Sequence, residues 1–338
     1  MSNSASATSA STFAAVSPDA HRCYEYTQVD VFAERPLEGN ALAIFPEARG
    51  LSTDEMQAIA RETNLSETTF ILPRAAEVER ERGVHVRIFT TREELQFAGH
   101  PTLGTASWLH LNHPVLRGAR EITLELRIGP IKVTFDGQQQ GPGVFATMRQ
   151  NDPIFGEVHG PAAIAQALGL AIEDLDPSLP IQTVSTGVAF CIVPLRSLDV
   201  AARLAIPQAV AQAYLAPSDA KFFHCITRAT AGSGAEWHAR MQFYNGEDPA
   251  TGSASGCAIA YLVRHGLAAS GQPIVIEQGI EMLRASRITV QAAIDGDLVT
   301  DVRVGGRTIP IASGRFFLPR CTEFQQAGYG NPQQGRAL

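Results

Sequence analysis

AGHPTLGTA at residues 98–106 and GEDPATGSA at residues 246–254 are two copies of one short pattern. Aligned on their prolines, both copies place a polar residue before the proline and a glycine, a hydroxyl residue and an alanine after it. An apolar stretch follows each copy, and Asp248 lies 148 positions after His100. Internal repetition at the length of one domain predicts two similar domains that carry one such turn each.

Each copy has the composition of a helix N-terminus. A proline favours the first turn, a glycine lets other groups approach the backbone, and a threonine or serine can cap the helix. The free N–H groups and partial positive charge of a helix start bind carboxylates or phosphates. If the two domains face each other, both helix starts lie on one cleft, with His100 and Asp248 just before them.

A glycine-rich turn before a helix is also a common structural feature with no role in binding. Neither copy contains the phosphate-loop pattern G-x-x-x-x-G-K-[ST], and no G-x-G-x-x-G follows a strand and opens a helix. The repetition, with an ionisable residue before each proline, favours a functional pair.

Strand patterns outnumber helix patterns in the rest of the chain and seldom alternate with them, which predicts an α+β fold rather than a doubly wound parallel sheet. Residues 52–55 form a capping box, and the helix that they open is expected to end near Asn64. Residues 121–135 predict a hairpin that turns at Gly129 and Pro130. Near the end of the chain, two separate strands are expected at 298–304 and 316–318.

The 338 residues are enough for two domains of roughly 100–200 residues each. A stretch rich in glycine and glutamine at 136–143 predicts the linker between them. We expect a first domain at 24–140 and a second at 144–311, with a strand at 312–320 returning to the first. Residues 1–22 are rich in serine and alanine and predict a disordered tail.

Composition excludes several classes of partner. The formal net charge is −7 and no stretch concentrates lysine and arginine, which argues against nucleic acids and anionic membrane surfaces. No apolar run approaches the roughly 20 residues of a membrane span. The five cysteines form no C-x-x-C pair, so neither a disulfide framework nor a structural zinc site is expected. The N-terminal stretch lacks the features of a signal peptide, and we expect a cytoplasmic protein.

Further motifs occur in a fixed order with the two turns: VDVF at 29–32, PLEGN at 36–40, NLSE at 64–67 and FAGHP at 97–101. Over residues 24–318 the chain resembles the PhzF family of phenazine biosynthesis isomerases. The resemblance implies the diaminopimelate epimerase fold, in which two domains each wrap a barrel-like, mostly antiparallel sheet around a central helix. It also implies a site in the cleft between the domains and a homodimer.

The phenazine-pathway members of this family isomerise trans-2,3-dihydro-3-hydroxyanthranilate without a metal or an organic cofactor. The resemblance implies that Glu67 is the acid/base and that His100 and Asp248 contact the substrate and aid proton movement. It also implies a set that holds the substrate carboxylate or lies near it: Ser66, Gly99, Gly252 and Ser253.

Taken alone, Glu67 lies between a helix end and a strand. This position is typical of a solvated surface carboxylate. Moving a proton between two carbons of one molecule, however, needs a single group that takes the proton and returns it. A carboxylate suits this role if partial burial raises its pKa toward the working pH. The helix-start donors would then stabilise negative charge that spreads toward the substrate carboxylate.

Racemases and epimerases of the same fold use two opposed cysteine thiols, where this sequence has His100 and Asp248. Amino-acid racemisation is therefore disfavoured, and we predict an isomerase of a small cyclic carboxylate that needs no metal and no cofactor. Two alternatives stay open: an epimerase, racemase or other isomerase of this fold with a different substrate, and a protein that binds a small carboxylate without turnover.

Overall fold

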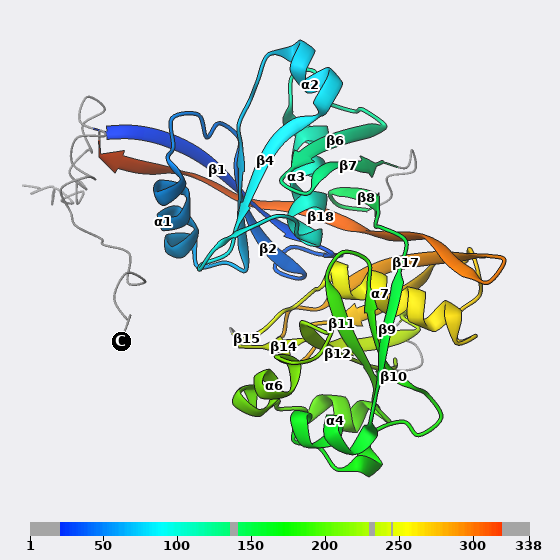
Figure 1. Cartoon of the computed structure of the whole chain (residues 1–338). Coiled ribbons are helices and arrows are strands. Elements are labelled where there is room, and N and C mark those ends of the chain that lie inside the picture. Colours follow the sequence, from blue (N-terminus) through cyan, green and yellow to red (C-terminus); the bar gives the residue numbers. More distant parts are fainter. Residues whose placement is uncertain (1–20, 136–140, 230–233, 245, 320–338) are drawn as a thin grey trace, which may run out of the picture.

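The computed structural model describes residues 21–135, 141–229, 234–244 and 246–319 (Figure 1). Within these ranges the chain forms one long, strongly curved sheet with helices inside its curves and outside them. The predicted α+β class is confirmed. The helices in the described part of the chain are all too short or too polar to cross a membrane.

In the first half of the molecule, a ring of strands closes around helix α3 (Gly99–Asn112). The ring closes because β18 pairs with β8 on one side and with β1 on the other. Helix α3 is buried on nearly every side, as its continuous run of apolar and small residues requires. The ring consists of β1 (His21–Val31), β2 (Asn40–Phe45), β3 (Glu67–Ile71), β4 (Val84–Phe89), β6 (Glu121–Leu126), β7 (Gly129–Thr134), β8 (Val144–Arg149) and β18 (Leu298–Pro319).

In the second half, the sheet continues from β18 and curls around helix α7 (Gly252–Arg264), with an open edge at β9. Its further strands are β17 (Ser286–Asp295), β16 (Ile274–Gln278), β13 (Trp237–Arg240), β12 (Phe222–Arg228), β11 (Ala189–Pro194), β10 (Ile181–Ser185) and β9 (Ile154–His159). Outside this curve lie α4 (Pro161–Leu168), the 3-10 turn η1 (Ile172–Asp174), α5 (Leu198–Ala202) and α6 (Gln208–Leu215). The two curves of this sheet, each around one central helix, are the barrel-like arrangement that was expected.

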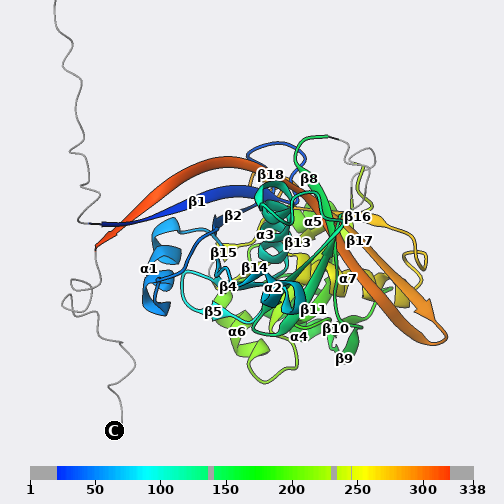
Figure 2. The same cartoon turned by 90° about the horizontal axis from the view of Figure 1, so that it is seen from above.

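Strand β18 is shared by both halves, and Figure 2 shows it running beside β1 as one long curved ribbon. The expectation of two short strands here is wrong, because the glycines and the proline between them do not interrupt pairing. A Cβ on Gly306 would meet Cδ1 of Phe32 at 2.3 Å, so the glycine allows a close crossing rather than a turn. Pro310 is exposed and lies beside an irregularity in the pairing with β1, where a missing N–H is tolerated.

Helix α1 (Thr53–Thr63) packs outside the first ring and matches its prediction. Ser52 and Glu55 form both hydrogen bonds of the capping box. Asn64 adopts a left-handed conformation with φ 51° and ends the helix, so the chain turns directly into β3. The helix therefore sets the position of Glu67, which opens that strand.

Three other expectations need correction or lie outside the described residues. The hairpin turns at Arg127 and Ile128, because Leu126 pairs with Gly129 and Pro130 is already in β7. Strand β1 begins at His21, so His21 and Arg22 of the predicted tail belong to the sheet; residues 1–20, like residues 136–140 of the expected linker, lie outside the described ranges. The division at 140 and 144 stays a prediction, and β8, which follows it, pairs with both β7 and β18.

Smaller elements complete the fold: α2 (Ala76–Arg82), β5 (Glu94–Leu95), β14 (Gln242–Phe243) and β15 (Gly246–Glu247). The last two form a short hairpin whose second strand is the beginning of the second copy of the repeated turn. This hairpin and the loop after β4 both lie where the two halves of the molecule meet.

Candidate active site

The N-termini of the two central helices meet between the two halves of the molecule. Helix α3 begins at Gly99 and α7 begins at Gly252. A Cβ on Gly99 would lie 3.2 Å from the backbone nitrogen of Ser253, so the two helix starts are in contact across the halves. Free N–H groups of both helices are thus directed toward one region.

The two copies of the turn are not equivalent in three dimensions. Helix α3 begins before its proline, whereas α7 begins after Pro249, so His100 lies inside a helical turn and Asp248 lies in a loop. Gly104 is consequently core: a Cβ there would lie 2.7 Å from Leu42, which rules out a role for it at the site. The expected side-chain caps are also absent from both helix starts, and the Thr251 hydroxyl donates to Asp248 instead.

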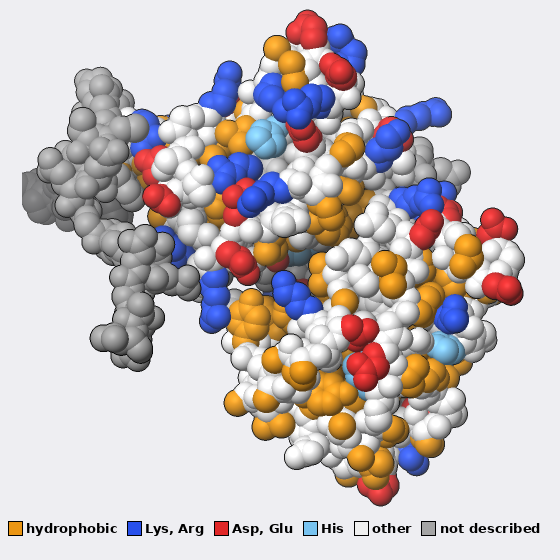
Figure 3. Space-filling view, in the orientation of Figure 1, with side chains coloured by type: hydrophobic (Ala, Val, Ile, Leu, Met, Phe, Trp, Pro, Cys, Tyr) orange, Lys and Arg blue, Asp and Glu red, His pale blue; other side chains and the backbone are white. Residues whose placement is uncertain are grey.

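A cavity of about 440 Å³ lies beside the meeting point and is lined from both halves. Figure 3 shows the surface hollowed between the upper and lower halves of the molecule. The structure brings every site residue that was predicted from the sequence to the wall of this cavity. These residues are Ser66, Glu67, Gly99, His100, Asp248, Gly252 and Ser253.

Glu67 and His100 face each other inside the cavity. Oε2 of Glu67 lies 3.4 Å from Nε2 of His100, and the two side chains are only 17% and 5% exposed. Neither of these two atoms has a hydrogen-bond partner among the described residues. Two buried polar atoms without partners at a cavity wall are where a ligand can bond.

Asn40 links His100 to Asp248. The sequence pattern did not single out this residue. Its side-chain amide donates to Oδ1 of Asp248 (2.7 Å) and to the carbonyl of Ala250 (3.1 Å), and it lies 3.2 Å from Nδ1 of His100. The only indication of Asn40 in the sequence is its place in the PLEGN motif. An asparagine after a glycine is typical of a turn.

Known proteins resemble this chain in both sequence and structure. The family described as phenazine biosynthesis-like protein (PhzC-PhzF) matches residues 29–314. The chain belongs to this family.

Several relatives share about a third of their residues with this PhzF-family chain. A trans-2,3-dihydro-3-hydroxyanthranilate isomerase of Pseudomonas aeruginosa is 35% identical over 298 residues, which cover 87% of this chain and 100% of the relative. The isomerase of the same name from Pseudomonas chlororaphis is 35% identical over 302 residues, covering 87% and 100%. An uncharacterized isomerase of Mesorhizobium japonicum is 34% identical over 303 residues, covering 87% and 98%.

Solved structures of the family have the same fold. A PhzF-family protein of Bacillus anthracis superimposes with a TM-score of 0.77 at 28% identity, over 87% of this chain and 99% of that one. A Pseudomonas aeruginosa protein described as a predicted epimerase gives 0.73 at 36% identity, over 87% and 99%. A hydroxyproline epimerase from Agrobacterium vitis gives 0.59 at 14% identity, over 88% and 93%, and shares the fold alone.

Burial sets the protonation states in the cavity of this PhzF-family protein. Burial, together with the negative charge of Asp248, raises the pKa of Glu67 to about 8. Burial also raises the pKa of Asp248 to about 6, although hydrogen bonds from Thr251 and Asn40 oppose the rise. Near pH 7 the raised pKa therefore keeps Glu67 largely protonated, while Asp248 is largely ionised. Burial lowers the pKa of His100 to about 3, so its imidazole is neutral.

A buried ion pair holds the loop that carries Asp248. The Arg240 guanidinium donates two hydrogen bonds to the carboxylate of Glu247, at 2.8 Å and 2.6 Å, and others to carbonyls including that of Ala201. Gln278 binds the carbonyl of Asp248 itself at 2.7 Å. These contacts fix the backbone on both sides of the Asp248 side chain, and only the tertiary structure reveals them.

The cavity lining contains no cysteine among its described residues. Cys191, Cys225 and Cys257 are buried elsewhere, and burial raises the pKa of each thiol. A pair of opposed thiol bases, as in the racemases of this fold, is therefore not built around this cavity.

Glu157, His159 and Asp219 form a cluster, remote in the fold from the helix starts, whose ligand atoms lie within 4.8 Å of one another. Both ring nitrogens of His159 already have partners: the hydroxyl of Tyr214 at 2.9 Å and that of Thr183 at 2.7 Å. A metal ion here would have to displace one of these bonds, so the cluster is better explained as a polar contact within the fold.

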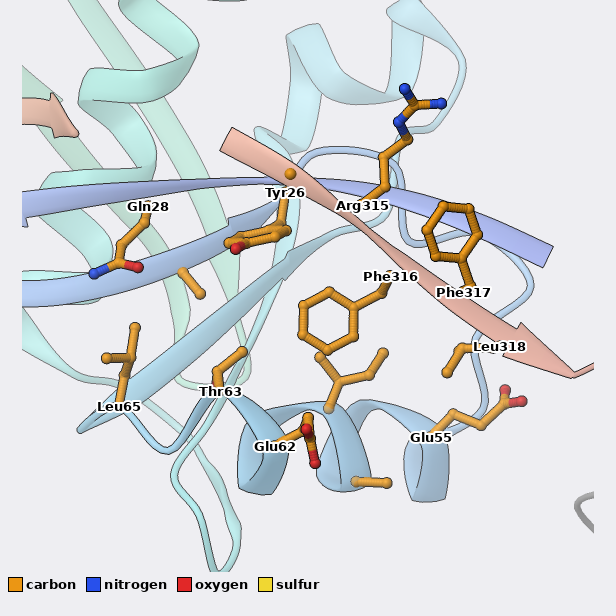
Figure 4. A pocket seen from close by; sticks show the side chains of 14 residues that line it. Tyr26, Gln28, Glu55, Glu62, Thr63, Leu65, Arg315, Phe316, Phe317 and Leu318 are labelled. Atoms are coloured by element: carbon orange, nitrogen blue, oxygen red, sulfur yellow. The ribbon is translucent and has the colours of Figure 1, made fainter. Parts of the chain in front are cut away.

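A larger hollow, of about 810 Å³, lies between α1 and the β1–β18 ribbon (Figure 4). Its ionisable side chains do not converge. Glu55 is bound in the capping box and by Arg22, and Arg315 points away from Phe316 and from the helix in Figure 4. Ionisable side chains face each other instead in the smaller cavity at the helix starts, where Glu67 and His100 lie 3.4 Å apart.

Proposed function

We propose that this protein is an isomerase that moves a proton within a small cyclic carboxylate, as trans-2,3-dihydro-3-hydroxyanthranilate isomerase does. The observation that carries the proposal is the Glu67 carboxyl, whose raised pKa and partner-free oxygen lie in a cavity between two helix N-termini. Membership of the PhzF family supports the same reaction class.

In the proposed reaction the ionised form of Glu67 takes a proton from one carbon of the substrate. The C–H bond breaks, its electron pair enters the conjugated system of the ring, and an O–H bond forms on Glu67. The same O–H then delivers its proton to another carbon, so the substrate is rearranged and Glu67 is ionised again. A carboxylate with a raised pKa is a stronger base than an ordinary glutamate, which favours the first step.

The surrounding groups have separate roles in this proposal. Backbone N–H groups at Gly99, Gly252 and Ser253, with the hydroxyl of Ser253, bind the substrate carboxylate and stabilise charge that spreads toward it. Ser66, the residue directly before β3, adds a polar contact. His100, which is neutral, positions the Glu67 carboxyl through Nε2, since 3.4 Å separates the two atoms.

Asp248 is proposed to contact the substrate on the side of the second half. It is ionised near neutral pH, with Asn40 and Thr251 donating to its two oxygens. A fixed negative charge here attracts a cationic or hydrogen-bond-donating substituent on the ring, such as an amine. It also keeps the proton on Glu67 between the two transfer steps.

The direct test is incubation with trans-2,3-dihydro-3-hydroxyanthranilate while the ultraviolet spectrum is followed. Wild type should consume the compound and Glu67→Gln should not, although both should remain folded. A substrate that carries deuterium at the abstracted position should give a product with deuterium at the reprotonated carbon, because the same group takes and returns the proton. Equal rates for the two proteins would remove Glu67 from the mechanism.

Two other functions remain as outcomes of the same experiments. Deuterium exchange at the α-carbon of an amino acid, with inversion, would instead indicate racemisation. Tight carboxylate binding that Glu67→Gln leaves unchanged, with no exchange into any ligand, would indicate a binding protein.

The family also suggests how the enzyme is assembled and where it acts. We propose a cytoplasmic homodimer, and light scattering of the full chain, with fractionation of cells that produce it, would test both points. A monomer at micromolar concentration would contradict the first.

A further inference from the structure

The cavity extends beyond the groups with proposed roles, and one of its sides is aromatic. Phe190, Phe222, Phe243 and Tyr244 all line it. Neighbouring ring centroids lie 5.8 Å, 6.1 Å and 5.3 Å apart along this order, so the four rings form one continuous wall. Exposure rises from 1% at Phe190 to 43% at Tyr244, which places the end at Tyr244 toward the surface.

The first half of the molecule adds further apolar lining to the same cavity, from Leu65, Leu95 and Phe97. Aromatic rings facing a cavity are best satisfied by another planar apolar group that stacks on them.

The outer end of this wall carries positive charge. The Arg92 guanidinium, from the loop after β4, lies 4.8 Å from the ring centroid of Tyr244 and so reaches across from the first half. The ammonium of Lys221 lies 5.8 Å from the ring centroid of Phe222. Neither cation has a carboxylate within 4 Å in the described ranges. Glu93 is an acidic neighbour at this end.

Glu247, a further carboxylate of the cavity lining, is neutralised by Arg240 in a pair whose side chains are 14% and 5% exposed, and Glu67 and Asp248 lie at the helix starts. At the outer end of the wall, two cations, Arg92 and Lys221, are therefore opposed by one carboxylate, that of Glu93. The cavity volume of about 440 Å³ also falls within the roughly 300–1,000 Å³ of sites that hold drug-sized ligands, rather than a single small ring.

We propose that this aromatic wall, with Arg92 and Lys221 at its outer end, is a second subsite that binds a planar apolar group bearing an anionic substituent. The group belongs to the same ligand whose carboxylate lies at the helix starts, so this inference rests on the proposed function. The substrate class that follows is a cyclic carboxylate extended by a planar apolar group that bears a second acidic substituent.

The test compares three ligands by isothermal titration calorimetry on the full chain: benzoate, 2-naphthoate and naphthalene-2,6-dicarboxylate. The affinity should rise in that order by about threefold to tenfold at each step, from added stacking and then from the second carboxylate. Tyr244→Ala should weaken both naphthalene ligands by about tenfold and leave benzoate unchanged. Arg92→Gln should weaken the dicarboxylate alone.

Matched variants separate the subsite from general effects. Arg92→Lys keeps the charge and should preserve the preference for the dicarboxylate, while Arg49→Gln, at an exposed arginine outside the cavity lining, should change nothing. Equal affinities for the three ligands, no measurable binding of any of them, or an equal loss of all three in Tyr244→Ala would overturn the proposal.

The same experiments distinguish failure of the second subsite from failure of the proposed function. Glu67→Gln should lose isomerisation but keep the ranking of the three ligands. An intact ranking without isomerisation by wild type would contradict the proposed function alone. Isomerisation of the small ring substrate with a flat ranking would contradict the second subsite alone.

Discussion

Replacing Glu67 with glutamine is expected to stabilise the protein at alkaline pH while it removes the proposed proton carrier. An unfolded chain ionises this glutamate near pH 4.5, whereas folding raises its pKa to about 8. Wild type should therefore lose stability relative to the variant as the pH rises from 4.5 to 8, because ionisation favours the unfolded state over this range.

The structure sets the size of this effect. The full separation between the two pKa values corresponds to about 5 kcal/mol at 1.36 kcal/mol for each pH unit. The Glu67 side chain keeps 17% of its exposure to water and its charge is coupled to that of Asp248, so we expect a gain of about 2–4 kcal/mol at pH 9. At pH 5 the gain should fall below about 1 kcal/mol.

Urea unfolding at pH 5 and pH 9, followed by circular dichroism, measures the difference. Glu62→Gln on the exposed side of α1 is the matched control, since it makes the same substitution outside the cavity at the helix starts. A Glu67→Gln variant that is no more stable than wild type at pH 9, or equally stabilised at both pH values, would refute the assignment of a raised pKa to Glu67.

Three further predictions concern the supports of the site. Asn40→Ala should raise the pKa of Asp248 by removing a donor to its charged form, and so move the acidic limb of the kcat/KM profile upward by about 1–2 pH units; an unchanged limb would contradict this. Arg240→Gln should destabilise the protein by about 3–5 kcal/mol in urea unfolding because it leaves the largely buried Glu247 carboxylate without its counter-ion, and the double variant with Glu247→Gln should recover part of that loss. Gly104→Ala should cost about 1–3 kcal/mol of stability, measured as a lower urea midpoint, because its Cβ has no room in the core; an unaffected midpoint would show that the core can adjust there.

Much of the local structure followed from the sequence. The capping box predicted where α1 begins, and it formed as expected because its hydrogen bonds join residues three positions apart. The repeated turn predicted two helix starts on one cleft, since free N–H groups and small residues occur together in both copies. The α+β class followed from the excess of strand patterns.

Other features depended on contacts between distant parts of the chain. Strand β18 continues through Gly305 and Gly306 because neighbouring strands and Phe32 crowd against them, which no local pattern reveals. Asn40 read as a turn residue because its partners, Asp248 and Ala250, lie far away in the sequence.

The sequence by itself determined which residue types are available to the cavity and where the elements that carry them begin, because hydrogen bonds and apolar spacing act over a few positions. The tertiary structure alone decided the protonation of Glu67, since its pKa depends on exclusion of water and on the charge of Asp248 from the other half of the molecule. It also decided that the first glycine of the repeat pair, Gly104, fills the core while the second, Gly252, faces the cavity. The physical reason is that α3 begins earlier within its copy of the turn than α7 does.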